Sequence, residues 1–316
     1  MDIVYSDRYQ IDIGAHVFHM GKYARVRDGL VSRGLIGAAA LVEPAPAGWD
    51  ELALVHTAEY IEKTRSGGFR ASELALLELP WSTSVAEGFR LMAGGTIAAA
   101  RLAIEAGARL ARDPGAAAPG EQGLAASANL GGGFHHAFAD HGEGFCLFND
   151  APMAIRRLLA DRAIGRAAIV DADVHQANGT AALLGADPSV FTYSIHQENN
   201  YPARKPPSTL DRGLRDGVGD EDYLATLGAD LPRIFDSRPD LVYYIAGADP
   251  YEDDQLGGLR VTRHGLRRRD RLVFGAACRA GVPVVVLLAG GYARQLGQTV
   301  AIHVATVEEA RLMAEF

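Results

Sequence analysis

The chain of 316 residues carries 31 Lys and Arg against 39 Asp and Glu, and its formal net charge of −8 argues against nonspecific binding to nucleic acid. Hydrophobic residues make up 48% of the chain, enough for a sizeable core, and the length suits one large α/β domain or two smaller ones. The two cysteines exclude a disulfide framework, and the longest apolar stretch, at 282–289, is far shorter than the ~20 residues that cross a bilayer.

The first residues lead directly into strand-like sequence, without the basic start and apolar run of a signal peptide. Together with the low cysteine number, this favours a reducing, cytoplasmic location without membrane association. The sequence gives no indication of the oligomeric state.

Short β-branched runs alternate with long amphipathic stretches along the chain. In chain order, strands are expected at 2–6, 125–130, 167–171, 190–195, 241–246 and 284–289, and helices at 85–107, 150–162, 222–235, 262–280 and 293–313. Several of the strands are apolar almost throughout, which is typical of strands buried on both faces of a parallel sheet. The pattern therefore predicts one doubly wound α/β domain, with a central, mostly parallel sheet and helices on both faces.

Caps and loops complete the expected organisation. Asn149 and Thr262 are expected to cap the N-termini of their helices. The segment 112–123 (RDPGAAAPGEQG) is rich in Pro, Gly and Ala, and we expect a flexible surface loop inside a single domain spanning 1–316. The long loop at 199–219, rich in Pro, Gly and charge, is expected to be functional.

Chemically active side chains gather where the expected strands end. The segments are GGGFHH at 131–136, GFCLFND at 144–150, DADVH at 171–175, ADP at 248–250 and GGY at 290–292. Open α/β sheets bind their ligands at the carboxyl ends of the strands. These separate segments are therefore expected to form one site.

Two carboxylates and one imidazole in these segments suit a divalent cation. Asp173 and His175 are two residues apart, so their side chains can point the same way, and Asp249 follows a neighbouring strand. Three protein ligands leave an open position for water and a carbonyl oxygen. Zinc fits this set, and iron(II) fits by ligand type. Asp-x-His taken alone more often marks a solvated turn.

The consecutive histidines His135 and His136 are candidate proton carriers. The three preceding glycines allow a turn that brings both rings to one pocket. Asp171 can orient one ring through its far nitrogen. The alternative is a pair of structural histidines in a turn.

Three aromatic residues are further candidates. Tyr292 can donate a hydrogen bond to a developing oxyanion, although a Gly-Gly-Tyr segment alone more often places a tyrosine in the core. Phe145 and Tyr201 can line an apolar channel for a methylene chain, and ordinary core positions are the alternative. Cys146 is expected to be a small buried residue.

Taken together, these segments resemble the zinc-dependent histone deacetylase superfamily over nearly the whole chain. Its class IV branch and the bacterial deacetylase-like relatives are the most similar. The resemblance is carried by VHTAEY at 55–60, DADVHQANG at 171–179, NYP at 200–202, DGVGD at 216–220, LGGL at 256–259 and GGY at 290–292. It implies a single-domain arginase/deacetylase-type α/β fold.

The resemblance also implies roles for individual residues. Asn178 matches the partner of His136, a position where some branches have Asp, and its uncharged amide implies a less basic His136. A structural potassium ion is implied near Ser194 and Ile195, together with Asp171, Asp173 and His175. The remaining implied roles are zinc binding by Asp173, His175 and Asp249, proton transfer by His135 and His136 with Asp171 behind His135, carbonyl polarisation by Tyr292, and substrate binding by Phe145, Tyr201, Gly144 and Gly290.

The implied reaction removes an acyl group from an acylated amine, with acyl-lysine in a protein or peptide as the first expectation. N-acetylpolyamines and other small acyl amides are alternatives. The resemblance to the class IV branch adds substrates with long acyl chains. A ureohydrolase would share the fold but would need carboxylates for a second metal. A non-catalytic binder of acylated ligands would be expected to lack a metal ligand or Tyr292, and all of these residues are present.

Overall fold

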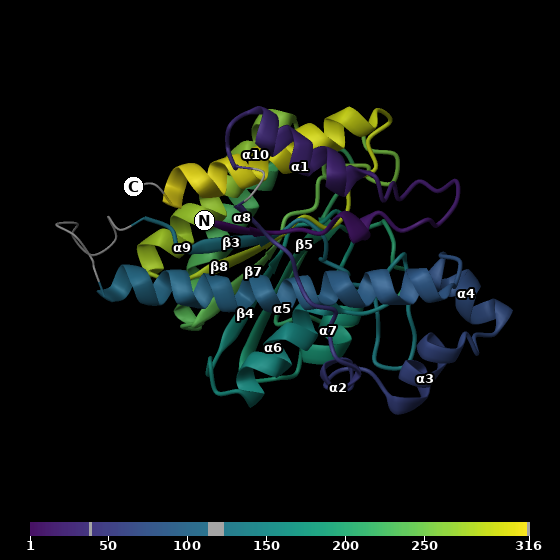
Figure 1. The fold of residues 1–316 in the computed structure, drawn as a ribbon. Helices are drawn as coiled ribbons and strands as arrows, with labels where there is room; N and C mark the ends of the chain where they lie inside the picture. Colours follow the sequence, from purple (N-terminus) through teal and green to yellow (C-terminus); the bar gives the residue numbers. More distant parts are fainter. Residues whose placement is uncertain (38–39, 113–122, 315–316) are drawn as a thin grey trace.

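The computed structural model describes residues 1–37, 40–112 and 123–314. Within them, parallel strands form one eight-stranded sheet in the order β2-β1-β3-β8-β7-β4-β5-β6 (Figure 1). The parallel α/β sheet predicted from the sequence is confirmed. The strands are β1 (Asp2–Val4), β2 (Leu41–Val42), β3 (Ala126–Asn129), β4 (Ala167–Asp171), β5 (Val190–Gln197), β6 (Leu210–Leu214), β7 (Leu241–Ile245) and β8 (Val284–Leu287).

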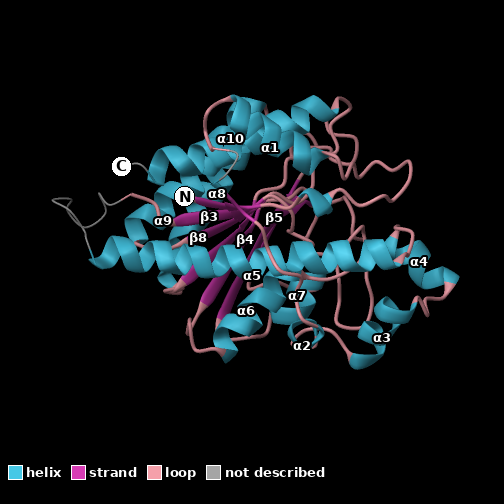
Figure 2. Cartoon of the chain, viewed as in Figure 1, coloured by secondary structure: helices cyan, strands magenta, loops and turns pink. Residues whose placement is uncertain are grey.

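Helices cover both faces of the sheet (Figure 2). One layer contains α1 (Lys22–Ser32), α8 (Asp220–Asp236), α9 (Arg263–Ala280) and α10 (Leu296–Ala314). The other contains α2 (Trp49–Leu52), α5 (Thr83–Arg112), α6 (Asp150–Ala160) and α7 (Asn178–Leu184). The short helices α3 (Ala58–Ser66) and α4 (Ala71–Leu77) lie beyond the N-terminal end of α5, and a 3-10 turn, η1 (Asp7–Tyr9), follows β1.

The core lies between the sheet and these layers. Every residue of β3, β4, β7 and β8 is buried, and β7 and β8 are apolar or aromatic throughout, as expected for strands covered on both faces. The helix α5 contacts the sheet and contributes Phe89 and Met92 to the core, where both side chains are fully buried. Burying a side chain of this size contributes roughly 1.5–3 kcal/mol. Among the described residues, no helix combines the length and hydropathy needed to cross a bilayer.

The register of the central strands brings their carboxyl ends level with one another. Asp171, the last residue of β4, pairs with Ile245 of β7, which pairs with Leu287 of β8, which pairs with Asn129 of β3. All four residues are at the ends of their strands. The loops that follow therefore start side by side, and this level edge positions the candidate site.

The six predicted strands all occur, whereas β2 and β6 were not predicted. β2 has only two residues, and β6 has the sequence LDRGL, in which polar residues interrupt the apolar pattern. Both are edge strands, so their exposed faces do not need apolar side chains. β6 also divides the segment 199–219, which was predicted to be a single long loop.

The five predicted helices occur with shifted ends, whereas α1 to α4 and α7 were not predicted. α5 continues to Arg112, so the predicted loop at 112–123 begins too early, and residues 113–122 lie outside the described ranges. For α3 the signals were available. Thr57 accepts a hydrogen bond from the Tyr60 amide at its N-terminus, and Gly67 adopts φ 77° at its C-terminus.

One of the two predicted caps is correct. Thr262 Oγ1 accepts a hydrogen bond from the Gly265 amide at 3.0 Å and caps α9. Asn149 occupies the N-cap position of α6 but does not cap it with its side chain. Its amide instead donates to the carbonyls of His135 and Ala137, so it holds the histidine loop in place.

Candidate metal centre and active site

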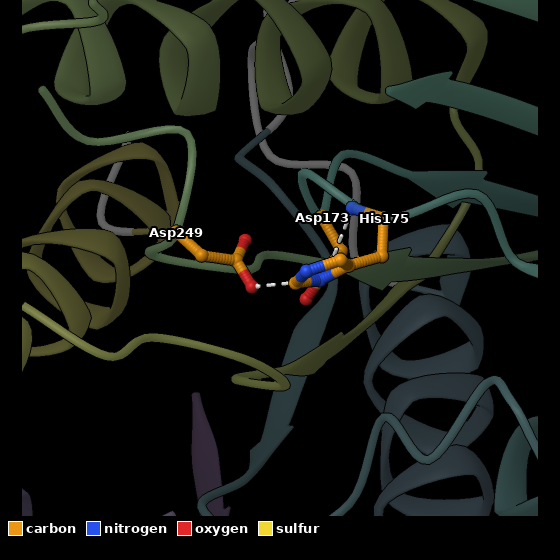
Figure 3. A group of neighbouring side chains, drawn as sticks. All are labelled: Asp173, His175 and Asp249. Carbon is orange, nitrogen blue, oxygen red and sulfur yellow. Dashed lines mark hydrogen bonds and ion pairs between the residues drawn. The ribbon is translucent and has the colours of Figure 1, made fainter. Parts of the chain in front are cut away.

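The three predicted metal ligands converge at the level strand edge. Asp173 and His175 follow β4, and Asp249 follows β7. One ligand atom from each lies within 4.8 Å of the others, and all three residues are buried. His175 Nδ1 is 3.0 Å from Asp173 Oδ1 and 3.5 Å from Asp249 Oδ2, and the Asp249 carboxylate points toward the imidazole (Figure 3).

Backbone amides hold both carboxylates in place. The Val174 amide donates to Asp249 Oδ1 at 2.9 Å, and the Gly290 amide donates to Asp173 Oδ2 at 3.1 Å. Asp249 Oδ2 is buried and has no hydrogen-bond donor among the described residues. Such an acceptor is costly to bury unless it has a partner.

The backbone beside the two carboxylates approaches so closely that only glycine fits at position 290. A Cβ on Gly290 would lie 2.1 Å from Asp249 Oδ2 and 2.5 Å from Asp173 Oδ2. Burial, followed by repulsion from Asp173, raises the pKa of Asp249. Two close, buried carboxylates with an unpartnered oxygen and an imidazole fit a divalent cation, which would supply the missing partner.

The predicted turn brings the two histidines together. Gly132 and Gly133 have φ values of 104° and 87°, which favour glycine. The Asp150 carboxylate fixes this turn by accepting hydrogen bonds from the Gly133 and Phe134 amides. His135 Nε2 then lies 3.0 Å from Nε2 of His136.

The outer nitrogens of the two rings face different partners. His135 Nδ1 lies 2.7 Å from Asp171 Oδ2, and His136 Nδ1 lies 2.6 Å from Asn178 Oδ1. Burial lowers the pKa of His135, but the carboxylates of Asp171 and Asp173 outweigh it and raise the pKa to about 9. Burial, with the positive charges of His135 and His175, holds the pKa of His136 well below its ordinary value. At neutral pH one ring is therefore charged and the other is neutral.

Tyr292 lies beside the metal ligands, after β8. Its amide donates to Asp254 Oδ2 at 2.6 Å, and its carbonyl accepts from Gln255 Nε2 at 2.9 Å. Its ring centroid is 6.5 Å from that of His175 and 5.9 Å from that of Phe145. Burial raises the pKa of Tyr292 well above its ordinary value, so its hydroxyl stays neutral and can donate.

A cavity of about 180 Å³ leads to these groups from the surface. Its walls include the predicted channel residues, and its lining is Glu78, His136, Gly144, Phe145, His175, Asn200, Tyr201, Leu256 and Tyr292. A second space of about 20 Å³ continues beside His135 and Asp173. A larger cavity of about 390 Å³ lies beside Arg166 and Val190, at the opposite ends of β4 and β5, away from these side chains.

The predicted potassium residues include neighbours on two adjacent strands, β4 and β5. Asp171 of β4 pairs with Ser194 of β5, and Ile195 follows. Asp171, Ser194 and Ile195 are buried, with Asp173 and His175 in the next turn of the chain. The structure thus brings all predicted site residues to one end of the sheet.

Several neighbours of the site were not identified from the sequence. Glu143 bonds to both Asn178 and Tyr201, and its only signal is its place directly before Gly144. Lys22 is fully buried and donates to the Ala289 carbonyl at 2.5 Å, and burial lowers its pKa to about 8. Nothing local distinguishes Lys22 from a surface lysine.

Two further histidines and one cysteine lie around the site. The His16 ring packs edge-on against Phe145, a residue of the cavity wall, with centroids 4.8 Å apart. His56 is structural, because its ring links the Phe138 carbonyl to the Asn149 amide. Cys146 is buried and unpaired, as predicted.

Comparisons with known proteins find similar sequences and a similar fold. The family model described as the histone deacetylase domain matches residues 16–307. An uncharacterized protein of Picosynechococcus sp. is 36% identical over 303 residues, covering 95% of each chain. Histone deacetylase 2 of Arabidopsis thaliana is 32% identical over 320 residues, covering 95% of this chain and 77% of the relative. The crystal structure of the HDA15 HD domain superposes with a TM-score of 0.77 at 23% identity, covering all of this chain and 89% of that one, and shows the same fold.

Proposed function

This chain belongs to the histone deacetylase family, and we propose that it is a metal-dependent hydrolase that removes the acyl group of acyl-lysine. The observation that carries the proposal is the convergence of Asp173, His175 and Asp249, of which His175 lines the cavity and Asp173 lines the smaller space beside it. Proton-carrying and hydrogen-bonding side chains line the same cavity. That combination is what hydrolysis of an amide requires.

Asp173, His175 and Asp249 would hold one divalent cation, for which zinc is the first choice, while iron(II) fits the same ligands. When bound, the cation supplies Lewis-acid activation of the amide carbonyl and of water. Among the described residues, one group of this kind is present, whereas a ureohydrolase with two metals would need further carboxylates. The ligand set therefore favours one catalytic metal.

The histidine pair would move the proton. The Asn178 carbonyl oxygen can only accept, so His136 Nδ1 carries a hydrogen and Nε2 keeps its lone pair. The neutral His136 can take a proton from the attacking water and later release it to the leaving amine. His135 contacts the same nitrogen, and Asp171 stabilises its charged form.

The Tyr292 hydroxyl would donate to the oxyanion that forms as the carbonyl is attacked. Its backbone amide and carbonyl are both held by side chains of the 254–255 turn, which fixes the backbone from which the side chain extends. One such donor typically contributes about 10²–10³ in rate.

Phe145 and Tyr201 would enclose the methylene chain of the substrate. Gly144 lies against the Tyr201 ring, where a Cβ would be 3.0 Å from its hydroxyl, and Gly290 keeps the space beside the carboxylates open. Glu78, an exposed carboxylate at the rim, favours N-acetylpolyamines as a second candidate, because these substrates carry a distant positive charge. The potassium site at Asp171, Asp173, His175, Ser194 and Ile195 is proposed as structural.

The test is a substrate panel with zinc-loaded and iron-loaded protein. Acetyl-, decanoyl- and myristoyl-lysine peptides and acetylputrescine would be assayed for release of the free amine. We expect turnover that a chelator abolishes and added metal restores. Hydrolysis that withstands complete metal removal, or no hydrolysis of any acyl amide by the loaded protein, would overturn the proposal.

A further inference from the structure

Glu143 connects two functional parts of the cavity that come from distant segments. Its Oε1 accepts hydrogen bonds from Asn178 Nδ2 at 2.7 Å and from the Tyr201 hydroxyl at 2.7 Å. Its side chain is only 13% exposed, and His141 Nε2 lies 3.5 Å from its other oxygen. Although burial raises the pKa of Glu143, hydrogen bonds from His141, Tyr201 and Asn178 lower it below its ordinary value. Glu143 is therefore an ionised acceptor at neutral pH.

The first connection determines which way the Asn178 amide points. An ionised carboxylate can only accept hydrogen bonds, so Nδ2 of Asn178 must face Glu143 and Oδ1 must face His136. The Gly179 amide supports this orientation by donating to Oδ1 at 3.0 Å. The orientation in turn places the hydrogen of neutral His136 on Nδ1 and leaves Nε2 able to accept a proton.

The second connection holds one wall of the cavity. The Tyr201 ring stands edge-on to His136, with centroids 5.0 Å apart and an interplanar angle of 86°. Tyr201 belongs to the loop between β5 and β6 and is partly exposed. Its hydroxyl bond to Glu143 ties this loop to the segment that carries Phe145, which also lines the cavity.

We infer that Glu143 is a positioning residue that sets the tautomer of His136 through Asn178 and fixes the Tyr201 wall through the phenol hydroxyl. The inference rests on the proposed hydrolase function for its kinetic consequences. The effect of Glu143 on the tautomer of His136 can be measured whether or not the protein turns over a substrate.

The variants Glu143→Gln and Glu143→Met form a matched pair. Both remove the charge and keep a similar size, but only Gln retains an oxygen that accepts from Asn178 and Tyr201. Asp140→Ala serves as the control, because Asp140 is an exposed carboxylate in the same loop and bonds to His141. Thermal melts check that each variant folds, and Glu143→Ala replaces Glu143→Met if that variant does not.

The first readout is the tautomer of His136 by NMR of zinc-loaded protein labelled with ¹⁵N in the histidine rings. His136→Ala assigns the signals. We expect an Nδ1-protonated ring in wild type, Glu143→Gln and Asp140→Ala, and a larger share of the Nε2-protonated form in Glu143→Met. An unchanged His136 spectrum in Glu143→Met would refute the inference, whether or not the protein turns over substrate.

The second readout is steady-state kinetics with the best substrate of the panel. Glu143→Met should lower kcat by about 10–100-fold, the usual effect of losing a partner behind an active-site histidine, and should raise KM. Glu143→Gln should recover most of both losses. Tyr201→Phe should raise KM chiefly, and adding it to Glu143→Met should raise KM no further.

These outcomes separate the two proposals. Independent, additive effects of Glu143→Met and Tyr201→Phe on KM would refute the wall connection. A glutamate-dependent tautomer in a protein that hydrolyses no acyl amide would support the positioning role and overturn the proposed function.

Discussion

Nε2 of His135 and Nε2 of His136 lie 3.0 Å apart, while the far nitrogens of the two rings meet unlike partners, a carboxylate and an amide. The pKa values of these adjacent imidazoles are shifted in opposite directions. Burial lowers the pKa of His135, but the carboxylates of Asp171 and Asp173 outweigh it, whereas burial and the charges of His135 and His175 lower the pKa of His136. Pairs of groups with separated pKa values commonly divide the acid and base roles of a reaction. Each ring can then be tested by changing only its partner.

Asn178→Asp should move the pH dependence of turnover upward. A carboxylate beside His136 stabilises the imidazolium and raises the pKa of that ring. If neutral His136 is the base, activity requires a pH above its pKa, so the acidic limb of kcat/KM should shift to higher pH. Profiles between pH 5 and 9 check this, with His264→Gln, at an exposed position of α9, as the control. An acidic limb that stays in place or moves downward would exclude His136 as the base.

Tyr292→Phe should lower kcat by about 10²–10³, because the oxyanion loses one donor. The substitution keeps the ring and its packing against Phe145, so the melting temperature and metal content should match wild type. Turnover and metal analysis on the same preparations check both expectations. Turnover close to wild type would remove Tyr292 from the proposed mechanism.

Asp249→Asn should have opposite effects on the two forms of the protein. In the metal-free form it removes a buried charge that Asp173 repels, so the melting temperature should rise. In the presence of zinc it removes a ligand, so the stabilisation by metal should shrink. Melting curves with and without zinc measure both effects. A metal-free variant that is less stable than wild type would contradict this account of the carboxylate pair.

Metal content should be one tightly bound ion per wild-type chain and should fall in Asp249→Asn. Elemental analysis after dialysis is the measurement. Two tightly bound transition-metal ions per chain would favour the ureohydrolase alternative.

His56 should make the fold sensitive to mild acid. Burial lowers its pKa to about 4, and its neutral ring accepts from the Asn149 amide, a bond that protonation breaks. Because the unfolded chain binds this proton near pH 6.5, stability is full above that pH and falls as pH drops toward 4. The difference between the pKa values of His56 in the folded and unfolded states corresponds to about 3 kcal/mol in the free energy of unfolding. Urea unfolding at several pH values should show a smaller loss for His56→Gln, and an unchanged loss would assign the acid sensitivity elsewhere.

The predictability of the fold depended on where each strand lies. β7 and β8 are buried on both faces, so their residues are apolar or aromatic throughout. Their positions could therefore be predicted from continuous apolar runs in the sequence. β6 lies at an edge, where Asp211 and Arg212 face partly outward, so its pattern resembled a loop. The helix α7 was not predicted. Its first two residues belong to the DADVHQANG segment at 171–179, which indicated a functional motif and gave no sign of a helix.

The site divides in the same way. The segments DADVH at 171–175 and GGY at 290–292 each identified candidate site residues from the sequence. Within each segment these residues are close in sequence and follow one strand, so their spacing is enough to recognise them. Glu143 escaped, because its partners Asn178 and Tyr201 lie 35 and 58 residues away. Lys22 escaped because only tertiary packing makes its ammonium buried.

The sequence alone determined the parallel α/β architecture, the family resemblance and the types of side chain offered at the strand ends, since apolar runs and motif spacing are local properties. Only the tertiary structure decided which nitrogen of each histidine faces which partner, which carboxylate oxygen lacks a donor, and which glutamate joins His136 to the cavity wall. These are contacts between segments far apart in the chain. Their geometry depends on strand register and loop packing, which no local pattern encodes.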